Sequence, residues 1–222
     1  MNRENIKRNG KMSTLLGVGL LFAFSLWTIL IQKIDVQAVG VNGAEVGFAG
    51  INTWFHSLTG VNMTLYNITD WLGLVPVFLC MVFGILGFVQ LLKRKSLFKV
   101  DRDIIFLGVY YVIVIFGYLI FEMIPINYRP ILINGFMEAS YPSSTTLLVL
   151  GVMPTAIFQV NLRVNSVKIK RIINITIVLF SAFMVIGRLV SGVHWITDIV
   201  GSVFLSAGLY YSYKGVTLLS IR

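Results

Sequence analysis

Long uncharged, apolar stretches alternate with short charged segments along this chain. Six stretches stand out, at residues 12–32, 71–92, 104–121, 139–162, 172–187 and 199–213. A transmembrane helix needs about 20 apolar residues to cross the hydrocarbon core. The first four stretches approach or reach this length, whereas the last two hold only 16 and 15 residues and must extend past Arg188 and Asp198. The pattern therefore predicts an all-α fold, a bundle of six transmembrane helices in a single membrane domain, 1–222.

The composition agrees with a membrane protein. Hydrophobic residues make up 57% of the chain, charged residues only 12%, and the mean hydropathy is +0.85. A soluble globular protein of 222 residues does not carry so much apolar surface, so soluble classes are excluded. The single cysteine, Cys80, lies within the second stretch, and no disulfide can form within the chain.

The positive charge is clustered. Fifteen of the 18 Lys and Arg residues fall in four segments, at 3–11, 93–102, 163–171 and 214–222. Two apolar stretches separate each basic segment from the next, so all four segments lie on the same side of the membrane. The positive-inside rule places that side in the cytoplasm. Both termini are then cytoplasmic, and the net charge of +9 reflects membrane topology rather than nucleic-acid binding.

A charged trio interrupts the last apolar region. Arg188, His194 and Asp198 fall within eleven residues, and ionisable groups in such sequence are costly and usually functional. His194 and Asp198 are four residues apart, which predicts that both side chains lie on one helix face. A carboxylate there can fix the imidazole tautomer and free the other nitrogen for chemistry, while an arginine fork suits phosphate oxygens. The alternative is a structural ion pair that joins two helices.

The loop at 121–143 lies on the same predicted outer side as the trio and contains Arg129. The fourth stretch then begins with hydroxyl residues, among them Ser143, Ser144 and Thr145. Hydroxyls at a helix start are ordinary caps, but they also lie where backbone N–H groups and the helix dipole favour an anion. Together with the trio they predict a phosphate site that contains a nucleophile.

These residues resemble the motifs of a known family. Arg188, His194 and Asp198 keep the spacing Ser-Arg, five residues, His, three residues, Asp, with Gly187 in place of the serine. This is similar to the third motif of the type 2 phosphatidic acid phosphatases, integral-membrane lipid phosphatases that share their site with vanadium haloperoxidases. The resemblance covers a phosphatase-like core at roughly 70–213.

The other two motifs of that family match in part. Its second motif, Pro-Ser-Gly-His, corresponds to Pro-Ser-Ser-Thr at 142–145, so that Thr145 stands where the family has histidine. Its first motif, Lys, six residues, Arg-Pro, corresponds to a segment that keeps Arg129 and Pro130 but has Glu122 in the lysine position.

The resemblance implies a mechanism without a metal or other cofactor. His194 would attack phosphorus to form a phosphohistidine, and Asp198 would orient it. The phosphoryl oxygens would be held by guanidinium, hydroxyl and backbone N–H groups of Arg129, Arg188, Ser143, Ser144 and Thr145. The family's second-motif histidine protonates the leaving group, which a threonine cannot do near neutral pH. Glu122 would pair with an arginine or, if protonated, replace that acid.

The sequence therefore predicts a multi-pass cell-membrane phosphatase with its site on the extracytoplasmic side. Expected partners are a lipid phosphate or diphosphate substrate and membrane lipids; nucleic acid is not expected, and no protein partner is identified. A polyprenyl diphosphate is favoured, because its hydrolysis expels a phosphate monoester, which can leave without an acid. The alternative is a catalytically inactive protein of the same fold that binds or transports lipid phosphates.

Overall fold

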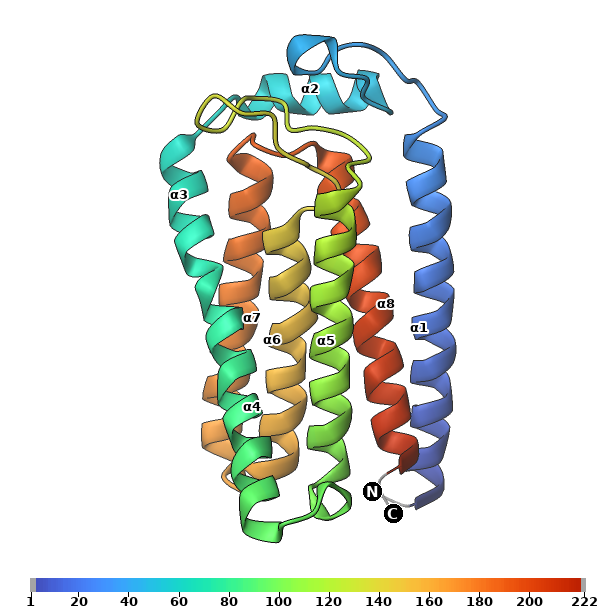
Figure 1. Ribbon diagram of the computed structural model, residues 1–222, viewed down its shortest axis with the longest axis vertical. Coiled ribbons are helices and arrows are strands. Elements are labelled where there is room, and N and C mark those ends of the chain that lie inside the picture. Colours follow the sequence, from blue (N-terminus) through green and yellow to red (C-terminus); the bar gives the residue numbers. More distant parts are fainter. Residues whose placement is uncertain (1–2, 221–222) are drawn as a thin grey trace.

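The computed structural model describes residues 3–220, which form a bundle of long helices (Figure 1). The long helices are α1 (Arg3–Ile31), α4 (Leu74–Arg94), α5 (Arg102–Met123), α6 (Ser144–Arg163), α7 (Val167–Val190) and α8 (Ile196–Ser220). Shorter elements are α2 (Ala49–Thr59), α3 (Met63–Leu72) and the 3₁₀ turns η1 (Val41–Gly43) and η2 (Leu97–Lys99). Between residues 3 and 220 only isolated β-bridges occur and no strand forms, which confirms the all-α prediction.

Within the described residues, five helical segments are long and apolar enough to cross a membrane. They are α1, the run Met63–Arg94 formed by α3 and α4, α5, α6 and α7. The sequence pattern predicted six such segments. The missing one is α8, which has 25 residues and is long enough, but is less apolar than the other five. Its polar residues lower its hydropathy, but Ser202, Ser206 and Thr217 are fully buried inside the protein and do not face lipid.

The helix ends differ from the predicted stretches in ways that the chain explains. The basic segment before residue 12 is already helical, because α1 begins at Arg3. The helix predicted from residue 139, α6, starts at Ser144, two residues after Pro142, whose ring cannot continue a preceding helix. The two short stretches do lengthen toward each other: α7 extends past Arg188 to Val190, and α8 includes Asp198.

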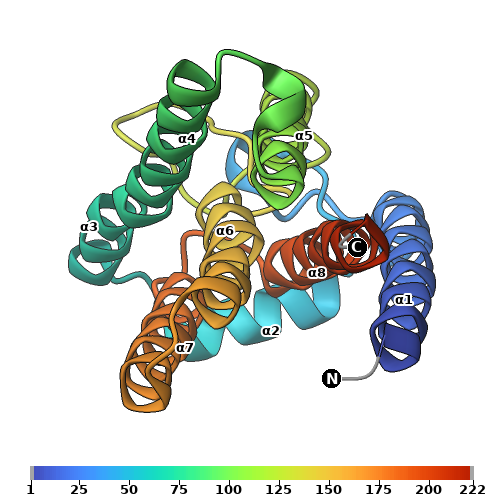
Figure 2. The same ribbon diagram turned by 90° about the horizontal axis from the view of Figure 1, so that it is seen from below.

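The bundle is held together by close helix packing. Seen from below, α1 stands against α8 (Figure 2). A Cβ on Gly17 would lie 2.6 Å from Ser212 N, and one on Gly215 would lie 2.7 Å from Thr14 N. Only glycine permits this approach, and small residues are the usual means by which transmembrane helices pack without a hydrophobic driving force.

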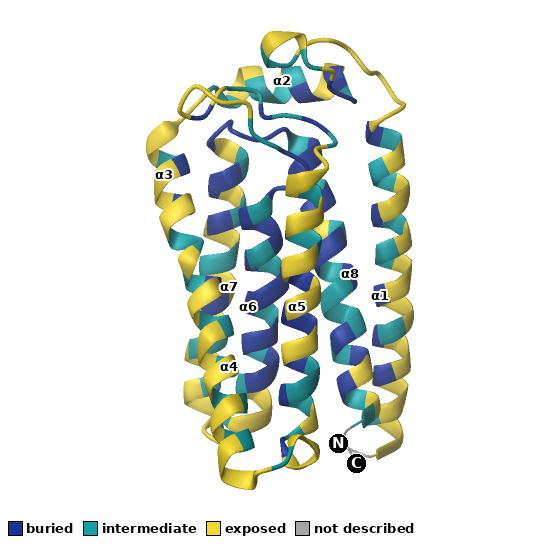
Figure 3. Ribbon diagram, in the orientation of Figure 1, coloured by how far each residue is buried: buried dark blue, intermediate teal, exposed yellow. Residues whose placement is uncertain are grey.

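Burial separates the inside of the bundle from its surface (Figure 3). α6 packs against α4, α5, α7 and α8. It is the most buried of the candidate spans, with 56% of its most apolar 18-residue stretch buried. Large apolar side chains are exposed along the outer faces of the other helices, as expected where lipid replaces water. These long apolar helices, with their lipid-facing side chains, make this a multi-pass membrane protein.

One end of the bundle is covered by irregular chain. The connection from α5 to α6, the connection from α7 to α8 and the helix α2 lie across the same end (Figure 1). The four basic segments lie at the opposite end, where α1 begins, α4 meets α5, α6 meets α7 and α8 ends. Arg222 of the fourth segment lies outside the described residues.

The charge bias predicts which end faces out. With Cys80 replaced by serine, a cysteine introduced at exposed Leu132 is expected to react with a membrane-impermeant thiol reagent in intact cells. A cysteine at exposed Asn165, at the basic end, is expected to react only after the membrane is opened. Labelling of Asn165→Cys in sealed cells would contradict this assignment, because it would show that the basic end faces outward.

Candidate active site

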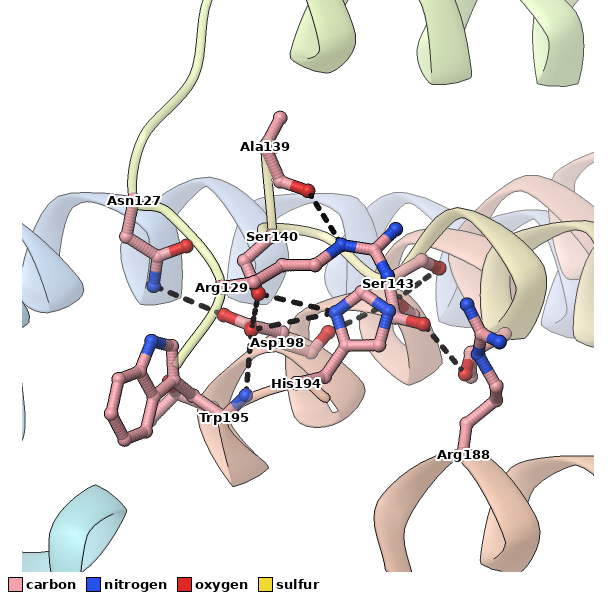
Figure 4. A network of polar contacts seen from close by, with 12 residues as sticks. Asn127, Arg129, Ala139, Ser140, Ser143, Arg188, His194, Trp195 and Asp198 are labelled. Carbon is pink, nitrogen blue, oxygen red and sulfur yellow. Dashed lines mark hydrogen bonds and ion pairs between the residues drawn. The ribbon is translucent and has the colours of Figure 1, made fainter. Parts of the chain in front are cut away.

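The covered end of the bundle brings the sequence-predicted residues together (Figure 4). They come from the α5–α6 connection, the start of α6, the end of α7 and the region where α8 begins: Arg129, Ser143, Arg188, His194 and Asp198. All five are buried, although each is polar or charged. Groups of this kind are rarely buried unless they are paired or functional.

His194 is not on a helix, so the prediction that it shares a helix face with Asp198 is wrong. α7 ends at Val190 and α8 begins at Ile196, and His194 lies in the connection between them. Gly192 turns this connection with a φ of +67°, and a Cβ there would overlap the carbonyl oxygen of Gly60. The two side chains still meet, with 3.8 Å between His194 Nδ1 and Asp198 Oδ2.

Ser140 lies between the histidine and the aspartate. The distance of 3.8 Å is too long for a direct hydrogen bond. The Ser140 hydroxyl donates to Asp198 Oδ2 at 2.5 Å, and its oxygen is 3.1 Å from His194 Nδ1. A hydroxyl has one hydrogen, so Nδ1 must be the donor in the second bond. The tautomer is therefore Nδ1–H, and His194 Nε2 carries the free lone pair.

The Asp198 carboxylate is anchored on both oxygens. Oδ1 accepts from Asn127 Nδ2 at 3.1 Å, and Oδ2 also accepts from the backbone N–H of Trp195 at 2.9 Å. The second bond caps the start of α8 from inside its first turn. Sequence reasoning missed Ser140 and Asn127. Ser140 could have been suspected from its place just before the hydroxyl residues that begin α6. Asn127 is a single asparagine in a loop, and nothing in the sequence distinguishes it from other loop residues.

Both arginines pair with carboxylates at the rim of the site. Arg129 Nη2 lies 3.1 Å from Glu138 Oε2, and Arg188 Nη1 lies 3.4 Å from Asp70 Oδ1. These carboxylates are far more exposed than the arginines, with side-chain exposures of 37% and 55% against 8% and 1%. The guanidinium groups are thus buried while their counter-ions remain partly in solvent.

Three buried nitrogens at the site have no hydrogen-bond partner among the described residues. They are His194 Nε2, Arg129 Nη1 and Arg188 Nε. Buried polar atoms are nearly always paired, so each exception needs an explanation. Here two donors and one lone pair come from the side chains that Figure 4 shows next to one another.

The charges around His194 determine its protonation state. Burial lowers the pKa of His194 well below its usual value of 6.5, and the nearby positive charges of Arg129 and Arg188 lower it further. The imidazole is therefore neutral near pH 7, which is the form that can act as a nucleophile.

The hydroxyl residues at the start of α6 occupy different positions. Ser143 is fully buried at the N-cap, where its hydroxyl donates to Thr146 Oγ1 at 3.1 Å and accepts no capping hydrogen bond from a backbone N–H of α6. Ser144 and Thr145 are in the first turn, whose N–H groups have no intrahelical acceptors. The methyl group of Thr145 faces the α3–α4 junction, where a Cβ added at Gly73 would lie 3.5 Å from it.

Glu122 does not form the ion pair with an arginine that was one of the two alternatives left open by the sequence. It is exposed near the end of α5 and lines a small notch with Tyr118, Tyr141 and Ser144. The carboxylate that pairs with Arg129 is Glu138. The structure therefore does not bring Glu122 to the arginines as an ion-pair partner.

Comparison with known proteins agrees with this arrangement. The family model described as "PAP2 superfamily" matches residues 104–217. A solved structure, the crystal structure of the first transmembrane PAP2-type phosphatidylglycerolphosphate phosphatase from Bacillus subtilis, is similar with a TM-score of 0.62 over 90% of this chain and 94% of that one. Its sequence is only 17% identical, so this likeness concerns the fold. No curated protein matches the chain. Because the family model covers half of the chain, and with it most of the buried charged site, the protein belongs to the PAP2 superfamily.

Proposed function

We propose that this protein is a membrane phosphatase that hydrolyses lipid phosphates or diphosphates through His194. The observation that carries the proposal is the group of unpaired buried nitrogens, His194 Nε2, Arg129 Nη1 and Arg188 Nε. One lone pair beside two guanidinium donors is the arrangement that attack on a phosphoryl group requires. Membership of the PAP2 superfamily supports a phosphatase-type hydrolase.

The proposed reaction has two steps. The lone pair of His194 Nε2 attacks phosphorus, and the bond to the leaving oxygen breaks as that oxygen takes its electron pair. Arg129 and Arg188 hold the phosphoryl oxygens and stabilise their charge in the transition state. The imidazole becomes positive, and Ser140 and Asp198 stabilise it through Nδ1–H. Water then attacks phosphorus, which releases phosphate and restores the neutral histidine.

The remaining sequence predictions join this proposal. Ser143, Ser144 and Thr145 would bind phosphate mainly through the open backbone N–H groups at the start of α6. No metal or other cofactor has a step in this mechanism. We treat α8 as the sixth span within a single membrane domain, because Ser202, Ser206 and Thr217 are buried and α8 ends at the same basic end at which α1 begins. The site would face the outer leaflet, where a lipid substrate enters laterally.

The leaving group decides which substrate suits the site. A lipid monophosphate expels an alkoxide whose conjugate acid is about as weak an acid as water, so the departure of this leaving group needs a proton. General acids accelerate such steps by about 10²–10⁴-fold. A lipid diphosphate expels a phosphate monoester whose second pKa is about 6, so this leaving group departs without needing a proton. Thr145 supplies no acid, which favours a diphosphate such as a polyprenyl diphosphate.

The rival is a catalytically inactive protein that binds or transports lipid phosphates. In purified protein, His194→Ala is expected to lower phosphate release by more than about 10³-fold, because the nucleophile is lost. Quenching the wild type in alkaline detergent with radiolabelled substrate is expected to trap a phosphoenzyme that is stable in alkali, labile in acid and not formed by His194→Ala. His56→Ala, which changes the other histidine, is the control and keeps most of the activity. Equal phosphate release by His194→Ala and the wild type would exclude His194 as nucleophile.

The leaving-group argument makes a separate prediction. The kcat/KM for a polyprenyl diphosphate is expected to exceed that for its monophosphate in the wild type. Thr145→His supplies an acid and is expected to raise kcat/KM for the monophosphate. The ratio of the diphosphate kcat/KM to the monophosphate kcat/KM is then expected to fall by about 10²-fold or more. Thr145→Asn, which has no acid, is the control. A wild-type preference for the monophosphate, or an unchanged ratio in Thr145→His, would contradict the argument.

A further inference from the structure

The helix α3 lies outside the family match and nevertheless forms one wall of the site. Its residue Tyr66 is 9% exposed and turns its ring toward both arginines. The ring centroid lies 5.6 Å from Arg129 Cζ and 4.7 Å from Arg188 Cζ. One aromatic ring is thus shared by the two cations that the proposed reaction uses.

We propose that Tyr66 is the positioning residue that holds both guanidinium groups in place for the phosphoryl group. This inference rests on the proposed function and deepens it. Tyr66 acts through Arg129 and Arg188 and needs no contact with the substrate. Its ring, rather than its hydroxyl, carries the role.

The physical reason is the repulsion between two buried cations. Arg129 and Arg188 both lie in the protein interior, where like charges repel more strongly than in water. Their carboxylate partners, Glu138 and Asp70, are at the rim and are screened by solvent. The negative face of a buried aromatic ring attracts both cations without adding a charge that would repel phosphate. It also gives each planar guanidinium a surface to lie near.

The residue at position 122 makes this alignment more important. The resembling family motif has a lysine where this chain has Glu122, and Glu122 is exposed and forms no ion pair with Arg129 or Arg188. Two cations are therefore left to bind a group that three would otherwise hold. Errors in the placement of either guanidinium are then not compensated by a third positive side chain.

Gly187 allows α3 to come close enough. A Cβ on Gly187 would lie 2.7 Å from Thr69 Cγ2, so any larger residue would push α3 away from the last turns of α7. The same approach brings Arg188 Nη1 to 3.4 Å from the carbonyl oxygen of Tyr66, and Asn62 N donates to Ser191 O at 2.9 Å. The glycine, which stands where the family motif has serine, is thus explained by the position of α3.

The test measures binding of inorganic phosphate to the full-length protein in detergent by calorimetry. Tyr66→Phe keeps the ring and is expected to bind phosphate within about twofold of the wild type. Tyr66→Leu removes it and is expected to weaken binding by at least about tenfold. Tyr111→Leu removes a similarly buried phenol far from the site, in α5, and is expected to leave the phosphate Kd unchanged. Wild-type affinity in Tyr66→Leu, or equal loss in Tyr66→Phe, would overturn the proposal.

A second route avoids changing Tyr66. Gly187→Ala is expected to weaken phosphate binding by displacing α3, and Thr69→Ser removes only the methyl group that would clash. The double variant Gly187→Ala with Thr69→Ser is therefore expected to recover most of the affinity. No recovery, in protein whose melting temperature matches the wild type, counts against the role of α3.

The two proposals fail separately. Phosphate binding tests Tyr66 even if the wild type hydrolyses nothing, which would overturn the phosphatase assignment alone. An active wild type whose phosphate affinity does not depend on the ring would overturn the role of Tyr66 alone. In active protein, Tyr66→Leu is expected to raise the KM for a diphosphate more than it lowers kcat.

Discussion

The site depends on the burial of two arginines beside a neutral histidine. Burial and the two positive charges keep the His194 imidazole unprotonated, so its Nε2 lone pair remains available. The same arginines have donors that the protein does not satisfy. Two buried cations with a single buried carboxylate, Asp198, leave a net positive charge in the interior, which is costly to fold. An oxyanion that binds there would neutralise the repulsion, which is why the arrangement fits phosphate better than a structural ion pair.

The Asp198 network joins this chemistry to the helix packing. The carboxylate caps the start of α8 through Trp195 N and holds Ser140, which in turn holds His194. The backbone carbonyl of Asp198 is 3.4 Å from Ser143 N, and Ser202 Oγ donates to the carbonyl of Ser143. The starts of α6 and α8 are therefore tied together at the point where phosphate would bind. The orientation of the histidine follows from the packing of these helices.

The sequence was sufficient for features that depend on composition and spacing. Charge-free length predicted the long helices, and the trio predicted that Arg188, His194 and Asp198 would meet. It was not sufficient where distant chain segments determine the local geometry. His194 lies outside a helix because Gly192 turns against Gly60, more than 100 residues earlier. α8 has the hydropathy of a buried helix because its neighbours, rather than lipid, surround it. The ring of Tyr66 reaches the arginines only through the packing of α3 on α7.

The protonation state of His194 tests this account most directly. In His56→Gln protein labelled with ¹⁵N-histidine, a single imidazole remains to be followed by NMR as the pH is lowered. The pKa lies below 6.5 in the folded protein, so the neutral Nδ1–H tautomer is expected to persist through pH 6.5. An unfolded chain would take up this proton near pH 6.5, so the folded state should lose stability as the pH falls below that value. Protonation at or above pH 6.5, or an Nε2–H tautomer, would contradict the central claim.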